Sequence, residues 1–182
     1  LASESTLDDS ELAALLRGAQ SDQLALRERF GRSQDLSRLT AERNVLRYLK
    51  AGTSLRISES ASNYSQWRSV ITLLAIGEGE LSAFELPKRL RKIVDKAGIR
   101  VRIESDEAWL ARVQAPSRWR FVGQALRITP ESVLSSCEIS LYDAEVTESG
   151  VIELLPYFKE QAVSMTAHRF GNPNKTINEL AL

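Results

Sequence analysis

Residues 87–103 read PKRLRKIVDKAGIRVRI, and this stretch is the clearest guide to the fold. Residues 87–97 predict a helix, because Pro87 suits a first helical position, Gly98 suits the residue just past the end, and apolar side chains recur between them at helical spacing. Residues 99–103 alternate aliphatic and arginine side chains, which is the period of a strand. A helix that leads directly into a strand is typical of an α/β protein.

The same alternation continues on both sides of this stretch. Because parallel strands need a helix to carry the chain back, it predicts a Rossmann-like α/β fold with an open, mostly parallel sheet of about five strands. The expected strands are residues 55–58, 81–86, 99–103, 119–122 and 139–142. The expected helices are one with Trp67 on its apolar face that ends at Gly77, residues 87–97, one capped by Ser105 that runs through Val113, and a short one opened by Thr129 and Pro130.

Two of the predicted strands contain arginine. Residues 55–57 (Leu-Arg-Ile) and 99–103 (Ile-Arg-Val-Arg-Ile) alternate strictly, whereas strands covered on both faces of a sheet are almost wholly apolar. We therefore expect both to be edge strands, or one face of the sheet to meet something other than its own helices.

Segments outside the alternating region are predicted to form a helix, a connector and a tail. An apolar stripe preceded by Thr6 predicts an amphipathic helix over residues 7–30. Residues 45–48 predict a short strand, and residues 162–167 are β-like. The chain is therefore divided into an N-terminal helix and connector (1–50), a Rossmann-like domain (51–150), a C-terminal tail (151–174) and a segment expected to be disordered (175–182). The apolar stripe consists of Leu12, Leu15, Leu16, Ala19, Leu26 and Phe30.

Composition argues against several kinds of partner. The 24 basic and 24 acidic residues cancel, so no strong field of the whole chain attracts nucleic acid or an anionic membrane. No apolar run approaches the roughly 20 residues that span a bilayer, so we expect no membrane insertion. The single cysteine, Cys137, cannot form an internal disulfide, and a reducing, cytoplasmic setting fits it. The only methionine is Met165, so we expect the chain to be part of a longer polypeptide.

The sequence offers little chemistry for catalysis. A Rossmann phosphate loop needs glycines directly after the first strand, but residues 59–64 read ESASNY. Cys137 has no histidine near it and is better explained as a partly buried structural cysteine, and the only histidine, His168, lies close to a segment expected to be flexible. We therefore expect no catalytic, cofactor-binding or metal-binding residue in this chain. An independent NAD- or nucleotide-binding domain with a non-standard loop stays open as an alternative, and so does a stand-alone interaction module.

Residues 151–174, VIELLPYFKEQAVSMTAHRFGNPN, closely resemble the C-terminal motif of the long proline utilization A proteins. Two further stretches are similar to the same family: LTAERNVLRY at residues 39–48 and VRIESDEAWL at residues 101–110. Together they suggest a resemblance over most of residues 36–174. The departure is Lys50-Ala51-Gly52, where a turn with proline is expected.

The resemblance implies that this chain is the non-catalytic C-terminal domain of a bifunctional enzyme that oxidises proline to glutamate. Such a parent has an FAD-dependent proline dehydrogenase module and an NAD-dependent module that oxidises glutamate semialdehyde, which forms from pyrroline-5-carboxylate, so FAD and NAD belong to the parent. The two modules are linked by an internal tunnel. The domain would pack on the upstream aldehyde dehydrogenase module of the same polypeptide and help to wall that tunnel.

The tail is expected to make this contact by adding residues 162–167 to an open sheet edge of the dehydrogenase module. Without that module, the strand is expected to be disordered or to pair with a second copy of the chain, which would give a homodimer through the tail. The residues expected at the interface are Leu154, Leu155, Phe158, Val163, Met165, His168, Arg169 and Phe170.

Overall fold

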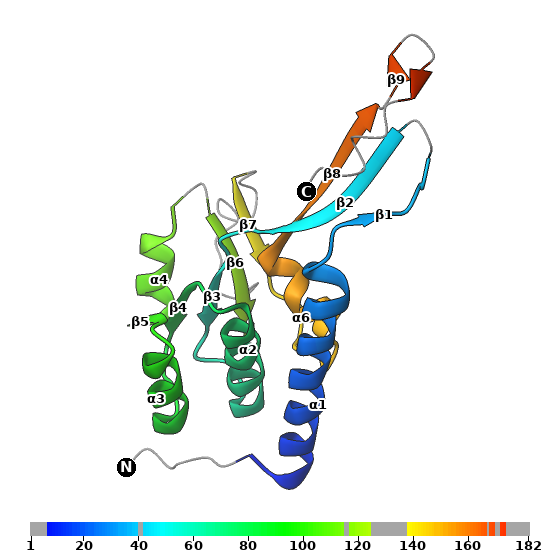
Figure 1. Ribbon diagram of the computed structural model, residues 1–182. Coiled ribbons are helices and arrows are strands. Elements are labelled where there is room, and N and C mark those ends of the chain that lie inside the picture. Colours follow the sequence, from blue (N-terminus) through cyan, green and yellow to red (C-terminus); the bar gives the residue numbers. More distant parts are fainter. Residues whose placement is uncertain are drawn as a thin grey trace.

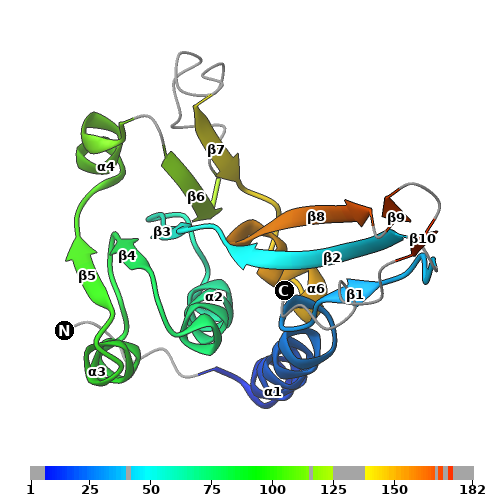
Figure 2. The same cartoon turned by 45° about the horizontal axis from the view of Figure 1, so that its top comes forward.

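The computed structural model describes residues 7–39, 42–114, 117–124, 138–166, 168–169 and 172–173. Five parallel strands form a sheet in the order β5-β4-β3-β6-β7 (Figures 1 and 2). The first strand lies at the centre and later strands add on both sides, which is the arrangement of doubly wound Rossmann-like folds. The predicted fold class is therefore confirmed. The strands are β3 (Ser54–Ile57), β4 (Glu80–Ala83), β5 (Arg100–Ile103), β6 (Ser117–Val122) and β7 (Ile139–Tyr142).

Local sequence signals set the ends of the helices between these strands. Ser62 and Ser105 cap α2 and α4, because each hydroxyl accepts a backbone hydrogen bond at 3.1 Å. Gly77 ends α2 with φ at 79°, a left-handed conformation that suits glycine. Pro87 lies at the N-cap of α3, one position before the one predicted. The helices are α2 (Asn63–Ile76), α3 (Lys88–Lys96) and α4 (Asp106–Arg112).

Both faces of the sheet carry an apolar core. Helices α2 and α3 cover one face, and α4 lies on the other (Figure 2). On the α4 face, Trp109 packs edge-on against Trp119, with 5.4 Å between the ring centroids, and against Phe121. The larger cluster, on the α2 and α3 face, includes Leu55, Ile57, Val70, Leu73, Leu81, Leu90 and Val94.

The presence of arginine in β3 has a different explanation from its presence in β5. Strand β5 is an edge, as predicted, but β3 is the central strand, so the edge prediction is wrong for it. Arg56 is fully buried and bonds to Asp106 at the start of α4 (2.5 Å) and to Ser82 on β4 (2.8 Å). Leu55 and Ile57 point to the opposite face, because successive side chains of a strand alternate. The alternation in β3 therefore reflects an ion pair between sheet and helix.

The N-terminal helix α1 (Asp9–Ala25) continues into a π-helical turn (Leu26–Phe30). Its cap is Asp8, whereas the predicted cap, Thr6, lies outside the described residues. The Asp8 carboxylate accepts a hydrogen bond from the Glu11 backbone at 2.8 Å, and the Glu11 carboxylate accepts one from the Asp8 backbone at 3.1 Å. This reciprocal capping box fixes where the helix begins.

The face that α1 buries differs from the predicted stripe. Leu12 and Leu16, which the stripe places inside, are 48% and 58% exposed. The helix instead turns a narrow face with small and charged residues toward the domain. The buried residues of α1 are Leu15, Gly18, Asp22 and Ala25.

A second, antiparallel sheet projects from the domain (Figure 1). Its strands are β1 (Gln34–Asp35), β2 (Glu42–Lys50) and β8 (Phe158–Thr166), in the order β1-β2-β8, and we call them the arm. Strands β2 and β8 pair over nine residues each. The short strand predicted at residues 45–48 is therefore part of a longer one. The expectation that the tail strand is disordered without the dehydrogenase module is corrected as well, because β8 pairs with β2 within this chain.

The tail enters the arm through α6 (Gly150–Leu154) and a 3₁₀ turn (Leu155–Tyr157). Beyond β8, strand β9 (His168–Arg169) pairs with β10 (Asn172–Pro173), within the predicted tail. Among the described helices, none combines the length and hydropathy that a bilayer span requires. The helix predicted at Thr129 and Pro130, Cys137, Phe170 and residues 175–182 lie outside the described residues.

Candidate interaction surface

Residues of this chain pack together at the place where a Rossmann-like sheet binds ligands. Ligands bind where the strand order reverses, beyond the carboxyl ends of the central strands, which here are β3 and β6. The Ser58 backbone donates to the Val122 carbonyl at 3.0 Å, and the Ser60 hydroxyl accepts from the Gln124 backbone at 2.9 Å. A Cβ atom on Gly123 would lie 2.6 Å from the Ser60 hydroxyl. These contacts hold the ends of β3 and β6 close together at that place.

Two carboxylates lie beside these strand ends, and both are already hydrogen-bonded. Asp106 is 5% exposed and accepts from the Ser58 hydroxyl at 2.6 Å. Burial would raise the pKa of Glu104, but hydrogen bonds from Arg112 and Ser82 outweigh it and hold the pKa below the ordinary value. No group of three or more His, Cys, Asp or Glu side chains in the described residues is placed to hold a metal ion. The geometry here is that of a packing network that ties α4 to the sheet.

The arm, in contrast, offers an open surface. On β8 the side chains of Val163 and Met165 are half-buried, whereas Ala162 and Ser164 are exposed. Residues two apart in a strand share a face, so Val163 and Met165 lie together on one side of the arm. Strand β8 is the last strand of its sheet in the described residues, so its outer edge has no strand partner there. Such an edge can add to another sheet through main-chain hydrogen bonds.

Aromatic residues hold the root of the arm against the domain. Phe158 stacks on Phe30 with 4.7 Å between ring centroids, and Tyr48 meets Phe30 edge-on at 4.9 Å. Thr53, just before β3, donates its hydroxyl to the Pro156 carbonyl at 2.5 Å. The direction in which the arm projects is therefore set by contacts with the domain.

Two buried ion pairs hold α1 and α6 against the domain. Arg68 on α2 forms two hydrogen bonds of 2.7 Å with Asp22 on α1, and both side chains are fully buried. Arg120 on β6 lies 3.3 Å from Glu153 on α6. Thr147 joins the pairs, because its carbonyl accepts from Arg68 at 2.8 Å and its backbone N–H donates to Glu153 at 2.7 Å. These contacts connect the N-terminal helix to the helix that leads into β8.

Burial alone would lower the pKa of Arg68, but the hydrogen bonds and charge of Asp22 outweigh it, so the pKa is raised. Arg68 is therefore charged in the folded chain at neutral pH. Sequence analysis missed both residues, because neither lies in a motif and they are 46 positions apart. Gly18 is the sequence feature that could have indicated this contact. The Arg68 side chain crosses α1 at this glycine, and a Cβ atom there would lie 2.6 Å from Arg68 Nε.

The structure divides the residues predicted for the interface into two groups, those buried in the core of this chain and those on its surface. Leu154 and Phe158 are 0% and 8% exposed and belong to the core of this chain, so the structure assigns them to internal packing instead of an exposed surface. The sequence pattern underestimates their burial, because it gives no sign that the tail packs into the core of the domain. Leu155 is 44% exposed and remains available for contact.

The other predicted interface residues lie along the arm and beyond it. Val163 and Met165 share one face of β8. His168 and Arg169 form β9, at the far end of the arm from the domain (Figure 1). The structure therefore places four of these residues in the segment that projects from the domain, and Phe170 lies outside the described residues.

The fold and its surface define a class: a doubly wound α/β domain of Rossmann type that carries a projecting β arm. No protein-family model matches the sequence, and no curated protein sequence matches it. Among solved structures, the chain is similar to proline utilization A (PutA) from Corynebacterium freiburgense, with a TM-score of 0.54 and 25% sequence identity. The similarity covers 92% of this chain and 15% of that one, so this chain spans a small part of the PutA length. The comparison supports a distant relation to PutA.

Proposed function

We propose that this chain is a non-catalytic domain of a proline-catabolic enzyme of the PutA kind. In this proposal it supports the aldehyde dehydrogenase module of the same polypeptide and covers its substrate tunnel. The observation that carries the proposal is the structural similarity to part of a PutA over 92% of this chain. The sequence resemblance of residues 151–174 points in the same direction.

The filled strand ends support a role without a nucleotide. A dinucleotide site needs backbone that the pyrophosphate can approach closely, but Ser58, Ser60 and Gly123 pack against one another at that place. In this proposal, FAD and NAD are bound by other modules of the parent enzyme. The Rossmann-like fold of this chain then has a structural role and binds no nucleotide.

The arm supports a role in docking. A sheet of one layer leaves much of its surface uncovered, and the outer edge of β8 offers main-chain groups for a further strand. We propose that β8 adds to a sheet of the dehydrogenase module, with Val163 and Met165 on the contacting face. His168 and Arg169 would then position the contact and would not transfer protons.

The coding sequence upstream of residue 1 tests the proposal most directly. It should encode an aldehyde dehydrogenase module in the same reading frame, and an unrelated module or a start codon at that point would overturn the proposal. The isolated chain should also show no saturable binding of NAD below about 100 μM by calorimetry. Binding in that range would favour the independent nucleotide-binding domain instead.

Paired substitutions in the parent enzyme test the docking face. Val163→Thr with Met165→Gln should slow aldehyde oxidation and leave proline oxidation nearly unchanged, because only one module loses its support. Ala162→Ser, on the opposite face of β8, is the control. Truncation after Gly150 should have the same effect but is less specific, because it also removes the core residues Leu154 and Phe158. Normal rates of both half-reactions in the Val163 and Met165 variant would contradict the proposal.

A further inference from the structure

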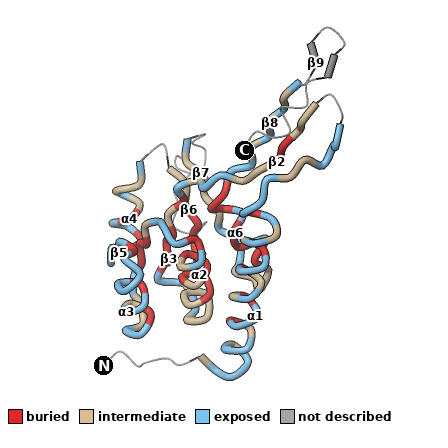
Figure 3. Tube along the Cα trace, viewed as in Figure 1, coloured by how far each residue is buried: buried red, intermediate tan, exposed pale blue. Residues whose placement is uncertain are grey.

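Helix α1 carries a row of leucines on its outer face. Leu12, Leu16 and Leu24 are 48%, 58% and 53% exposed, although the same helix buries Leu15 against the domain. With Gln20 they are spaced four residues apart, so they lie along one ridge of the helix, and such ridges pack into the grooves of other helices. Helix α1 lies at one side of the molecule, and much of its surface is exposed (Figures 2 and 3). The row is therefore an apolar surface that another helix can reach.

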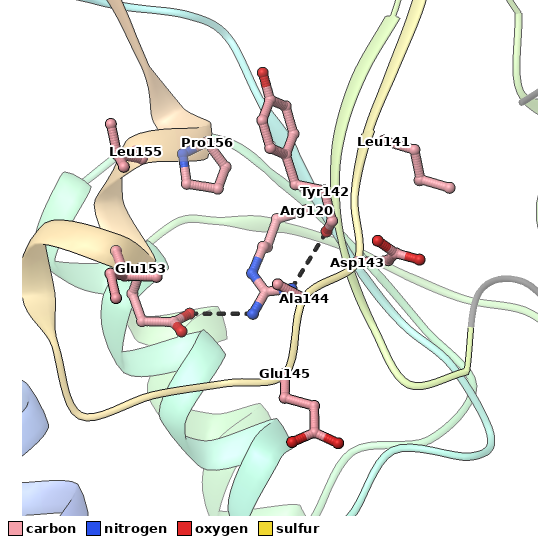
Figure 4. Close-up of a pocket in the computed structure, with 10 residues that line it drawn as sticks. Arg120, Leu141, Tyr142, Asp143, Ala144, Glu145, Glu153, Leu155 and Pro156 are labelled. Atoms are coloured by element: carbon pink, nitrogen blue, oxygen red, sulfur yellow. Dashed lines mark hydrogen bonds and ion pairs between the residues drawn. The ribbon is translucent and has the colours of Figure 1, made fainter.

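The inner side of α1 is fixed, so the outer row has one orientation relative to the domain. Besides the buried ion pair with α2, the Gly150 backbone of α6 donates to the Ser21 hydroxyl at 2.8 Å. Helix α6 is tied to β6 in turn, because Arg120 lies 3.3 Å from Glu153 (Figure 4). A surface that is already ordered loses little conformational entropy when a partner binds.

The two ends of this surface carry opposite charges. The acidic residues at the start of α1 are Asp8, Asp9 and Glu11, and the basic residues after its end are Arg27, Arg29 and Arg32. Asp9 and Arg27 are both exposed. Arg27 forms an ion pair with Glu28 at 2.7 Å, but these side chains are 68% and 40% exposed, so little is lost when Arg27 turns to another carboxylate.

The order of residues along the outer face is self-complementary. When two copies of α1 meet antiparallel, centred at the level of Gly18, each residue meets the one that lies equally far from Gly18 in the other direction. The pairs are then Asp9 with Arg27, Leu12 with Leu24, and Leu16 with Gln20. A parallel pair would instead bring the two acidic ends together. A different partner would not require an order that matches its own reverse, so the pattern favours a second copy of this chain.

We propose that α1 joins two copies of this chain in an antiparallel pair with twofold symmetry. The two ridges pack side by side at a crossing angle of about −50°, and the acidic end of each α1 lies toward the basic end of the other. Such an interface uses the same surface on both copies, so it closes at the dimer. The contact does not use β8, so it differs from a pairing through the tail and does not depend on the function proposed for the arm.

Sedimentation equilibrium of the full chain tests the apolar part of the contact. One pair of helices buries less area than a standard interface of about 1,600 Å², so the dimer should have a Kd of about 10 μM to 1 mM. Leu16→Gln with Leu24→Gln changes both copies and should raise the Kd at least about tenfold. Leu36→Gln with Leu39→Gln is the matched control, since these leucines are 73% and 53% exposed between β1 and β2. A native chain that stays monomeric at about 1 mM, or a Leu16 and Leu24 variant that dimerises as tightly as the native chain, would overturn the proposal.

Asp9→Arg and Arg27→Asp, made in two separate chains, test the charged ends. Each variant paired with itself has like charges at both ends of the pair, whereas the mixed pair has opposite charges at both ends. The mixed pair should therefore form about threefold to tenfold more tightly than either variant with itself, as measured by energy transfer between N-terminally labelled chains. The native pair should also be tighter than either variant with itself. Equal affinity of the mixed pair and both single-variant pairs would show that the copies do not meet through α1 in this way.

Discussion

The parallel domain and the arm are built on different principles, although they belong to one chain. In the domain, β3 and β6 lie under helices, and residues such as Leu55 and Phe121 are fully buried. In the arm, buried residues are few and most of β8 is exposed or half-buried (Figure 3). The domain therefore has a core of its own, whereas the arm depends on strand pairing and on its root.

The difference indicates that the arm, in contrast to the parallel domain, is the region that can present an exposed surface. Apolar burial supplies most of the stability of a small domain, so substitutions in the parallel domain and at its junctions should cost much more stability than substitutions along the arm. Conversely, the arm should tolerate changes that matter only when a partner is present. Four substitutions, in order of expected effect, can break or sharpen this contrast.

The largest loss is expected from Asp22→Ala, in the buried pair that joins α1 to the domain. The substitution leaves the Arg68 guanidinium buried without its carboxylate, and breaking such a pair costs about 3–5 kcal/mol. The free energy of unfolding, measured in urea, should fall by this amount.

Two controls separate the buried charge from the loss of any ion pair. Asp22→Leu with Arg68→Met removes both charges and should recover much of the loss. Glu148→Gln breaks the exposed pair with Arg17 and should have a much smaller effect. A loss for Asp22→Ala no larger than that for Glu148→Gln would show that the α1 contact does not stabilise the domain.

The second largest loss is expected from Gly150→Ala, where α6 meets α1. A methyl group on Gly150 would meet the backbone of Ser21 and Asp22, which cannot move aside as a flexible side chain could. Overpacking of this kind costs about 1–3 kcal/mol. Urea unfolding measures the loss, and a value below about 0.5 kcal/mol would mean that the two helices separate easily.

The sequence predicted those parts of the fold whose signals are local. The helix and strand at residues 87–103, the Ser105 cap and the end of α2 at Gly77 all depend on neighbours in the chain. The parallel arrangement follows as well, because a helix lies between successive strands, but the strand order does not: β3 was expected at an edge and is central.

Features set by contacts between distant residues could not be predicted in the same way. Helix α2 buries Arg68 and Thr72 beside Val70 and Leu73, because Asp22 arrives from α1. The buried faces of both helices therefore include polar residues that apolar periodicity alone does not place there. The pairing of β2 with β8 also joins segments more than 100 positions apart. The sequence therefore indicates only a connector and a tail where the structure has the two main strands of the arm.

The third prediction concerns Tyr157, which lies at the root of the arm. Its side chain is 3% exposed, and its hydroxyl has no hydrogen-bond partner in the described residues. Tyr157→Phe keeps the ring and removes the unpaired hydroxyl, so the free energy of unfolding should stay equal or rise by up to about 1 kcal/mol. A loss above 1 kcal/mol would reveal a bonded hydroxyl.

Alkaline pH adds a second readout to the same variant. Burial raises the pKa of the Tyr157 phenol, so ionisation is harder in the folded chain than in the unfolded one. The stability from the neutral phenol is complete below the unfolded pKa of about 10 and declines above it. Between about pH 8 and pH 11, the native chain should therefore lose more stability than the Tyr157→Phe variant. Equal losses would show that the phenol is not buried in solution.

The smallest effect on stability is expected in the arm. Val163→Thr with Met165→Gln keeps the size of both half-buried side chains, so the free energy of unfolding of the isolated chain should change by no more than about 0.5 kcal/mol. The control on the opposite face, Ala162→Ser, should change it as little. Hydrogen exchange supplies the direct comparison of the two regions, because amides of β8 should open at lower free energy than those of β3. If the Val163 and Met165 variant instead unfolds as readily as Asp22→Ala, the arm is part of the core, and the surface proposed for docking is needed to hold this chain together.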